Sequence, residues 1–152
     1  MGDVAYRKAT PEDIADIVRF QLAMARETEA IELNADVCSS GVGAVFEHPE
    51  SGQYFVSEVD GVVAASLLIT YEWSDWRNGL VWWIQSVYVL PDFRRKGIYR
   101  GLYSHIRSLA QANGDAKGIR LYVDRKNLLA QQVYTSLGMN GDHYQVFEWM
   151  KE

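Results

Sequence analysis

Three consecutive cations, Arg94, Arg95 and Lys96, precede Gly97 and the start of a predicted helix. The start of a helix offers free backbone N–H groups and the positive end of the helix dipole, and both suit a phosphate. Gly97 lets the backbone approach a ligand closely because it has no Cβ. The pattern predicts an anion site for a phosphate or pyrophosphate, with a solvated structural turn as the alternative.

A second group of chemically capable residues lies about thirty positions further along the chain. Asn127 stands where it can cap a helix running to Leu137, and Gly138 follows as a C-terminal stop. Tyr134 lies within that helix. A phenol with an ordinary pKa near ~10 can give a proton to a leaving group. The alternative is a tyrosine that only packs on the apolar side of the helix.

Both segments resemble motifs of the GNAT superfamily, the acyl-CoA-dependent N-acyltransferases. The pyrophosphate-loop pattern of that family is Gln or Arg, two free positions, Gly, one free position, then Gly or Ala. Arg94 and Gly97 match it, whereas Tyr99 stands where the family has a small residue. The family pattern Asn-x-x-Ala-x-x-x-Tyr-x-x-x-Gly, followed by Phe or Met, is matched by Asn127, Ala130, Tyr134, Gly138 and Met139.

The resemblance implies acetyl-CoA as co-substrate and assigns roles to its binding residues. The pyrophosphate would be held by the backbone amides of Arg95, Lys96, Gly97, Tyr99 and Arg100. Backbone groups at Val87 and Val89 would pair with the pantetheine arm. Asn127 would contact the same arm, and Tyr134 would be the general acid near the sulfur.

The general base is less clearly marked. Many relatives have a glutamate in the strand before the loop, and Gln85 stands at that place. A glutamine takes no proton at neutral pH, although it can position a water molecule or the substrate. The other candidates are Glu72, Glu148 and His143.

Acidic residues are expected to bind the acceptor. Glu27 and Glu29 lie at the end of the first predicted helix, and Glu72 lies on a central strand. Such carboxylates could attract an ammonium group, with a solvated helix end as the alternative.

Composition limits the class of protein. The chain has 152 residues with 48% hydrophobic content, so we expect one domain over residues 1–152. A net charge of −5 argues against general nucleic-acid binding, and no apolar run is long enough for a membrane span. The single Cys38 excludes an internal disulfide and favours a cytoplasmic protein. The three histidines lack metal-site spacing, so no metal is expected.

The elements that must position these residues follow from periodicity and turn signals. Strands are predicted at 4–9, 53–59, 62–73, 80–89, 118–124 and about 143–150, and helices at 14–30, 34–47, 98–112 and 127–137. Asp60-Gly61 and Asn78-Gly79 predict hairpin turns. The order β-α-α-β-β-β-α-β-α-β is a mixed α/β arrangement, which is the order of the GNAT fold, a mostly antiparallel sheet flanked by helices.

These observations predict an N-acetyltransferase that moves an acetyl group from acetyl-CoA to a small primary amine, such as a polyamine-like or amino-acid-like compound. Direct attack of the amine is expected because no nucleophilic side chain is placed for an acyl-enzyme. A non-catalytic acyl-CoA sensor and a protein lysine or N-terminal acetyltransferase are the alternatives. The resemblance also implies a possible homodimer.

Overall fold

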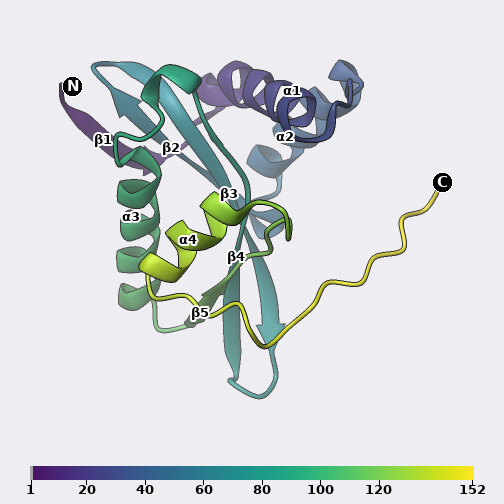
Figure 1. Cartoon of the computed structure of the whole chain (residues 1–152), viewed down its shortest axis with the longest axis vertical. Coiled ribbons are helices and arrows are strands. Elements are labelled where there is room, and N and C mark those ends of the chain that lie inside the picture. Colours follow the sequence, from purple (N-terminus) through teal and green to yellow (C-terminus); the bar gives the residue numbers. More distant parts are fainter. Residues whose placement is uncertain (1) are drawn as a thin grey trace. The chain divides into compact units, whose positions relative to one another are not determined.

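The computed structural model describes residues 2–152 (Figure 1). Residues 2–120 form one compact unit, and residues 121–152 form a second. The first unit holds a five-stranded sheet in the order β1-β2-β3-β4-β5. Its strands are β1 (Val4–Lys8), β2 (Gln53–Val59), β3 (Val62–Ser74), β4 (Gly79–Val89) and β5 (Ala116–Arg120), and its α-helices are α1 (Ile14–Glu29), α2 (Ala35–Glu47) and α3 (Ile98–Ala112).

The sheet is antiparallel from β1 to β4, and β5 lies parallel to β4. The turn between β2 and β3 has positive φ at both central residues, 50° at Asp60 and 81° at Gly61. This is the type I′ geometry whose twist matches that of the two strands. Asn78 also has a positive φ, 50°, before β4 begins. Both predicted hairpins are confirmed.

Alternation along β2 divides the core between the two faces of the sheet. Tyr54 and Val56 pack into a buried cluster with Ile17 of α1 and Val42 of α2. Phe55 points the other way, and its ring meets the ring of His105 on α3 at 6.2 Å. Helix α3 is on the side of the sheet opposite α1 and α2 (Figure 1), and it buries Ile98, Leu102, Tyr103 and Ile106.

A partly buried ion pair fixes the start of α1 to the sheet. Asp13 ends a short 3-10 turn (η1, Pro11–Asp13) and is 5% exposed. Its carboxylate accepts two hydrogen bonds from Arg7 of β1, at 2.8 and 3.0 Å, and one from the Thr10 backbone at 2.8 Å. Arg7 also pairs with Glu58 of β2. The network therefore joins β1, β2 and the first turn of α1.

The second unit contains helix α4 (Leu128–Ser136). Asn127 caps it as predicted, because its side-chain oxygen accepts a hydrogen bond from the Ala130 amide at 3.0 Å. Gly138 has φ 87° just beyond the helix, which confirms the predicted glycine stop.

The mixed α/β class and the first nine elements of the expected order are present, and two strands differ from expectation. Strand β5 begins and ends earlier than the predicted 118–124. The strand expected around residues 143–150 is not formed, since these residues have no regular secondary structure. A strand takes its backbone hydrogen bonds from a neighbouring strand, so strand-like side chains do not form one by themselves. No helix in residues 2–152 combines the length and hydrophobicity needed to cross a bilayer.

Candidate active site

Strand β4 is irregular at the point where the sequence places Gln85, Val87 and Val89. In its ladder with β3, Ser66 pairs with Tyr88 but Leu68 pairs with Gln85, so β4 has one extra residue. Ser86 accommodates this bulge with φ 55°, a left-handed conformation uncommon for a residue with a Cβ. A bulge interrupts the ladder and re-aims the side chains next to it.

The other edge of β4 is only partly covered by β5. The parallel pairing ends at Trp83 and Arg120, while β4 continues to Val89. Along residues 84–89, no described strand of residues 2–120 lies on that side. Val87 and Val89 thus lie on the part of β4 that extends past its pairing with β5.

The loop after β4 leads directly into α3. A short 3-10 turn (η3, Pro91–Phe93) is followed by Arg95 with φ 63° and Gly97 with φ 78°. Gly97 is the N-cap of the 15-residue helix α3, and a Cβ built on it would meet nothing within 4 Å. The backbone at this helix start is therefore open to a ligand, and the helix begins at Ile98 as predicted.

The cations of the loop are not equivalent. Arg95, Lys96 and Arg100 are exposed, and the Lys96 ammonium lies 5.9 Å from the centre of the Phe93 ring. Arg94 is exposed as well, and it contacts β4: its Nε donates to the Val89 carbonyl at 2.8 Å, and its guanidinium lies 5.3 Å from the centre of the Tyr88 ring. Arg94 thus holds the loop against β4.

Glu27, which the sequence suggests as an acceptor-binding carboxylate, lies against this loop. Its Oε2 accepts a hydrogen bond from Arg94 Nη2 at 2.9 Å, and its Oε1 accepts one from the Tyr88 hydroxyl at 3.0 Å. The Arg94 hydrogen bond lowers the pKa of Glu27, with a further contribution from Tyr88. Burial, followed by the Glu27 contact, raises the pKa of Tyr88. Glu27 therefore connects the last turn of α1 to the basic loop before α3.

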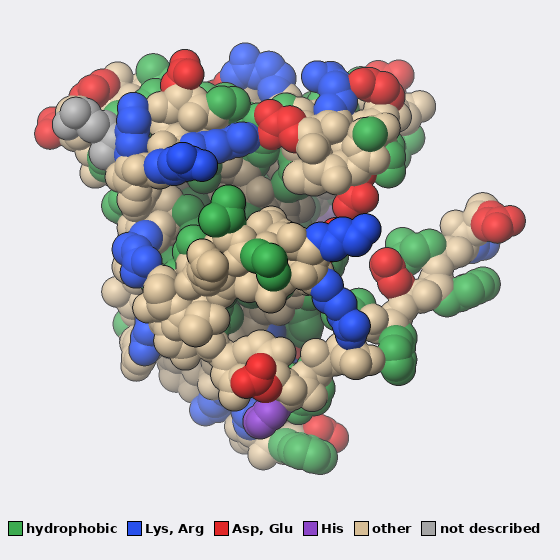
Figure 2. Space-filling view, viewed as in Figure 1, with side chains coloured by type: hydrophobic (Ala, Val, Ile, Leu, Met, Phe, Trp, Pro, Cys, Tyr) green, Lys and Arg blue, Asp and Glu red, His purple; other side chains and the backbone are tan. Residues whose placement is uncertain are grey.

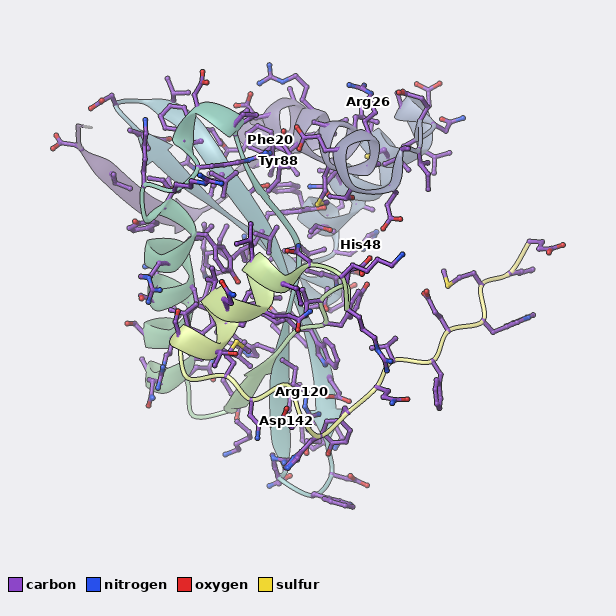
Figure 3. The ribbon with its side chains drawn as sticks, viewed as in Figure 1. Phe20, Arg26, His48, Tyr88, Arg120 and Asp142 are labelled. Carbon is purple, nitrogen blue, oxygen red and sulfur yellow. The ribbon has the colours of Figure 1, made fainter. Side chains whose placement is uncertain are left out.

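Helix α1 is also packed on β4 through aromatic rings. Phe20 of α1 and Tyr88 of β4 have ring centres 5.3 Å apart, and Figure 3 shows the two side chains together. The same two residues line an open groove of about 460 Å³ whose other walls come from α1 and the start of β3. None of the predicted site residues lines this groove.

Two further predicted residues contact polar partners on the sheet. Gln85 donates from Nε2 to the Thr70 hydroxyl at 2.7 Å. Glu72 accepts hydrogen bonds at Oε1 from Trp83 Nε1 at 3.1 Å and from Arg120 at 2.7 Å. The Trp83 hydrogen bond, followed by that from Arg120, lowers the pKa of Glu72. A carboxylate stabilised in its charged form is a weaker base, so Glu72 is a poor candidate for the general base.

The remaining predicted residues are Glu29 in the first unit and Tyr134, Glu148 and His143 in the second. Glu29 is the exposed last residue of α1. Tyr134 is half-buried in α4, and its backbone carbonyl accepts the amide of Met139 at 3.0 Å. Glu148 and His143, the other candidate bases, are exposed in the segment that follows α4.

Three residues of this region were missed by sequence reasoning: Ser86, Tyr88 and Thr70. The bulge at Ser86 has no marker in the sequence, because serine is not a typical residue for positive φ. Tyr88 joins Glu27 across 61 positions, and Thr70 joins Gln85 across 15. Only the tertiary fold brings such partners together.

The arrangement of β4, the basic loop and α3 defines a class of protein. Residues 14–139 match the model of the Acetyltransferase (GNAT) family, and the chain belongs to that family. It is an acyl-CoA N-acyltransferase.

Solved structures give the same result. A possible acetyltransferase from Clostridium difficile 630 is 40% identical, with 98% of each chain covered and a TM-score of 0.91. A predicted acetyltransferase from Clostridium acetobutylicum, solved with acetyl-CoA, is 20% identical over 96% of each chain, with a TM-score of 0.75. AAC(6')-Iy, in complex with the bisubstrate analog CoA-S-monomethyl-acetylneamine, is 14% identical over 99% of each chain, with a TM-score of 0.78. The last two show a shared fold. No curated protein is significantly similar in sequence.

Proposed function

We propose that this protein transfers an acetyl group from acetyl-CoA to the primary amine of a small molecule. The observation that carries the proposal is the succession, within residues 2–120, of a bulge in β4, an end of β4 that continues past its pairing with β5, and a basic loop at the start of α3. Acetyl-CoA is the donor bound in the Clostridium acetobutylicum structure, which shares this fold.

The residues present fit a coenzyme A diphosphate. The loop has exposed cations at Arg95, Lys96 and Arg100, and Gly97 leaves open space over the backbone. The N–H groups at the start of α3 supply the donors for phosphate oxygens. The backbone of Val87 and Val89 would pair with the pantetheine arm, and Asn127 would contact it while also capping α4.

The reaction is a direct substitution at the thioester. The amine nitrogen forms a bond to the acetyl carbon, the carbon–sulfur bond breaks, and the sulfur takes a proton from the Tyr134 hydroxyl. Gln85 orients a water molecule that takes the excess proton of the amine and passes it to the solvent, and the solvent returns a proton to the Tyr134 phenolate. Glu29 contributes negative charge that attracts a cationic acceptor. Glu27 and Glu72 contribute less, because each carboxylate is already paired with an arginine.

The first experiment is titration of the protein with acetyl-CoA, followed by a panel of amines monitored for thiol release. Binding with thiol release on one class of amine supports the proposal and identifies the acceptor class. Binding without turnover on any small amine would favour a protein substrate. No binding would contradict the assignment of the loop at 94–100.

The role of Tyr134 is tested by Tyr134→Phe. Loss of a general acid lowers the rate by about 10²-fold or more, while acetyl-CoA binding should stay within about threefold because the phenol acts on the leaving group. The alkaline limb of the rate profile should also change. Tyr122→Phe, at an exposed tyrosine of the same unit, is the matched control. If Tyr134→Phe keeps the rate of the unmodified protein, as Tyr122→Phe should, Tyr134 is not the general acid.

A further inference from the structure

Polar side chains from three neighbouring strands gather just before the β4 bulge, and they are here termed the polar row. The row consists of Thr70 and Glu72 on β3, Trp83 and Gln85 on β4, and Arg120 at the end of β5. Thr70 and Glu72 follow Leu68 at steps of two along β3, and Leu68 packs in the buried cluster with α1 and α2. The polar row therefore lies on the face of the sheet that carries these two helices, and all of it belongs to the first unit.

Gln85 is the residue of the polar row next to the bulge, and its side chain has a fixed partner. Its Nε2 donates to the Thr70 hydroxyl at 2.7 Å. The amide oxygen is then the end that can accept a hydrogen bond from an amine or from a water molecule. Because an amide takes no proton at neutral pH, Gln85 orients these groups but leaves the proton to the water, which is a weak base.

Glu72, the carboxylate of the polar row, is also a poor proton acceptor. Its Oε1 accepts hydrogen bonds from Trp83 Nε1 at 3.1 Å and from Arg120 Nη1 at 2.7 Å. These bonds, that from Trp83 first, stabilise the charged carboxylate and lower the pKa of Glu72. An ammonium nitrogen has no lone pair for the attack, so an acceptor bound beside the polar row has to arrive there uncharged.

The charges of α1 and of the polar row are compensated within the first unit. Basic side chains lie among the acidic ones around α1 and α2, at the top of Figure 2. Carboxylates of α1, of the turn after it and of β3 are paired with arginines, in the pairs Asp16–Arg19, Glu32–Arg26, Glu27–Arg94 and Glu72–Arg120. A compound with several ammonium groups is attracted most by uncompensated carboxylates. This arrangement therefore favours an acceptor with a single amine.

We infer, on the basis of the acetyl transfer proposed above, that the acceptor is an amine made weakly basic by a neighbouring carbonyl group, as in an amino-acid amide or a short peptide. An alkylamine or a polyamine is a poor substrate. The lone pair of the uncharged nitrogen forms the bond to the acetyl carbon, and the electron pair of the carbon–sulfur bond stays on the sulfur. The proton that the nitrogen then loses passes through the water held by Gln85 to the solvent.

The ionisation of the two kinds of amine gives the size of the preference. At pH 7 roughly a tenth of an α-amine with a pKa of about 7.7–8.0 is uncharged, against about 0.04% of an alkylamine with a pKa of ~10.4. The more basic amine is the better nucleophile, as it is among thiols, and this offsets part of the difference. A preference of about tenfold or more for the weakly basic amine remains.

Two isomers of one compound test the inference. Lysine amide with a formyl group on its ε-nitrogen has a free α-amine, the isomer with the formyl group on its α-nitrogen has a free ε-amine, and 1,4-diaminobutane represents the polyamines. Thiol release from acetyl-CoA at pH 7 and low acceptor concentration measures kcat/KM for each. The value for the α-amine should be about tenfold or more above the other two.

The outcomes of this comparison separate the inference from the proposed function. A kcat/KM for the ε-amine or the diamine that equals or exceeds that for the α-amine would overturn the inference. Acetylation of none of the three compounds by a protein that binds acetyl-CoA would overturn it as well. Failure to bind acetyl-CoA would instead contradict the proposed function itself.

Gln85→Glu tests the reason for the preference. A carboxylate at this place can take the proton of an alkylammonium group, so the ratio of kcat/KM for the α-amine to that for the ε-amine should fall by about threefold or more. Gln111→Glu adds the same charge at the exposed last turn of α3 and is the matched control, which should keep the ratio of the unmodified protein. An unchanged ratio in Gln85→Glu, with acetyl-CoA still bound, would show that protonation does not select the acceptor and would overturn the inference.

Discussion

The Glu27 side chain gives Arg94, in the basic loop before α3, a fixed position. Arg94 contacts Glu27, the Val89 carbonyl and the Tyr88 ring, and these partners come from α1 and β4. An arginine held in this way orders the backbone that follows it. The family motif therefore has a structural function here at its first position.

Replacing Glu27 by Gln should weaken acetyl-CoA binding without unfolding the protein. The Glu27 and Arg94 side chains are 40% and 45% exposed, so solvent screens the pair, and a surface pair contributes up to about 1 kcal/mol. This energy corresponds to a rise of about two- to fivefold in the dissociation constant of acetyl-CoA. Calorimetric titration measures it.

Glu29→Gln provides the control for this prediction. Glu29 lies two positions further along the same helix end and is exposed, so its replacement changes the net charge equally. If both variants bind acetyl-CoA as the unmodified protein does, Glu27 does not position Arg94 for binding. If both variants strengthen binding equally, the effect is one of general charge, because the loss of a carboxylate weakens the repulsion of a polyanion.

At the scale of elements, helix α3 lies so close to Tyr6 of β1 that Gly101 has little room for a side chain. A Cβ at Gly101 would overlap the hydroxyl and ring of Tyr6. Gly41 in α2 is the opposite case, since a Cβ there would meet nothing within 4 Å. Both residues are inside helices, where alanine is otherwise preferred over glycine.

Alanine substitutions at these two glycines should have opposite effects on the free energy of unfolding. Gly101→Ala should destabilise the protein by about 1–3 kcal/mol, because overpacking moves the Tyr6 ring or the helix. Gly41→Ala should stabilise it by up to about 1 kcal/mol. Urea denaturation followed by circular dichroism measures both values. Changes of the same sign would contradict the packing described for α3.

Sequence reasoning was most successful for elements defined by local signals. Asn127 and Gly138 mark the ends of α4, and Asp60-Gly61 marks a hairpin, because caps and turns depend on residues only a few positions apart. It was less successful for features that depend on distant partners. The contact between Glu27 and Arg94 joins residues 67 positions apart, and no local pattern marks it.

The last predicted strand, which is not formed, also shows that a strand cannot be predicted from its own residues alone. Residues 143–150 have the side chains of a strand, but composition does not specify which edge completes it. The bulge at Ser86 depends on the register of β3 against β4, which is likewise a tertiary property.

For the whole molecule, the Arg7–Asp13–Glu58 network makes stability dependent on pH. Arg7 lowers the pKa of Asp13 below its ordinary value of 3.8. A carboxylate with a lowered pKa in the folded state binds fewer protons than it does when the chain unfolds. Its contribution is therefore complete above about pH 4 and is lost as the pH falls through the folded-state pKa.

Asp13→Asn should accordingly be less stable than the unmodified protein at pH 7, and the difference should shrink as the pH falls below 4. Urea denaturation at a series of pH values measures it. Asp75→Asn, at the exposed β3–β4 turn, serves as the control and should follow the unmodified protein throughout. A constant difference at every pH would show that Asp13 acts by packing rather than by charge.

The exposed cations of the loop also have a kinetic consequence. The chain as a whole carries a charge of −5, so an approaching polyanion is first repelled. Arg95, Lys96 and Arg100 attract it only within roughly one screening length, about 8 Å at physiological ionic strength. Added salt weakens the distant repulsion and the close attraction together. The encounter rate then varies little with salt concentration. The loss of affinity at high salt appears instead as a shorter lifetime of the bound complex.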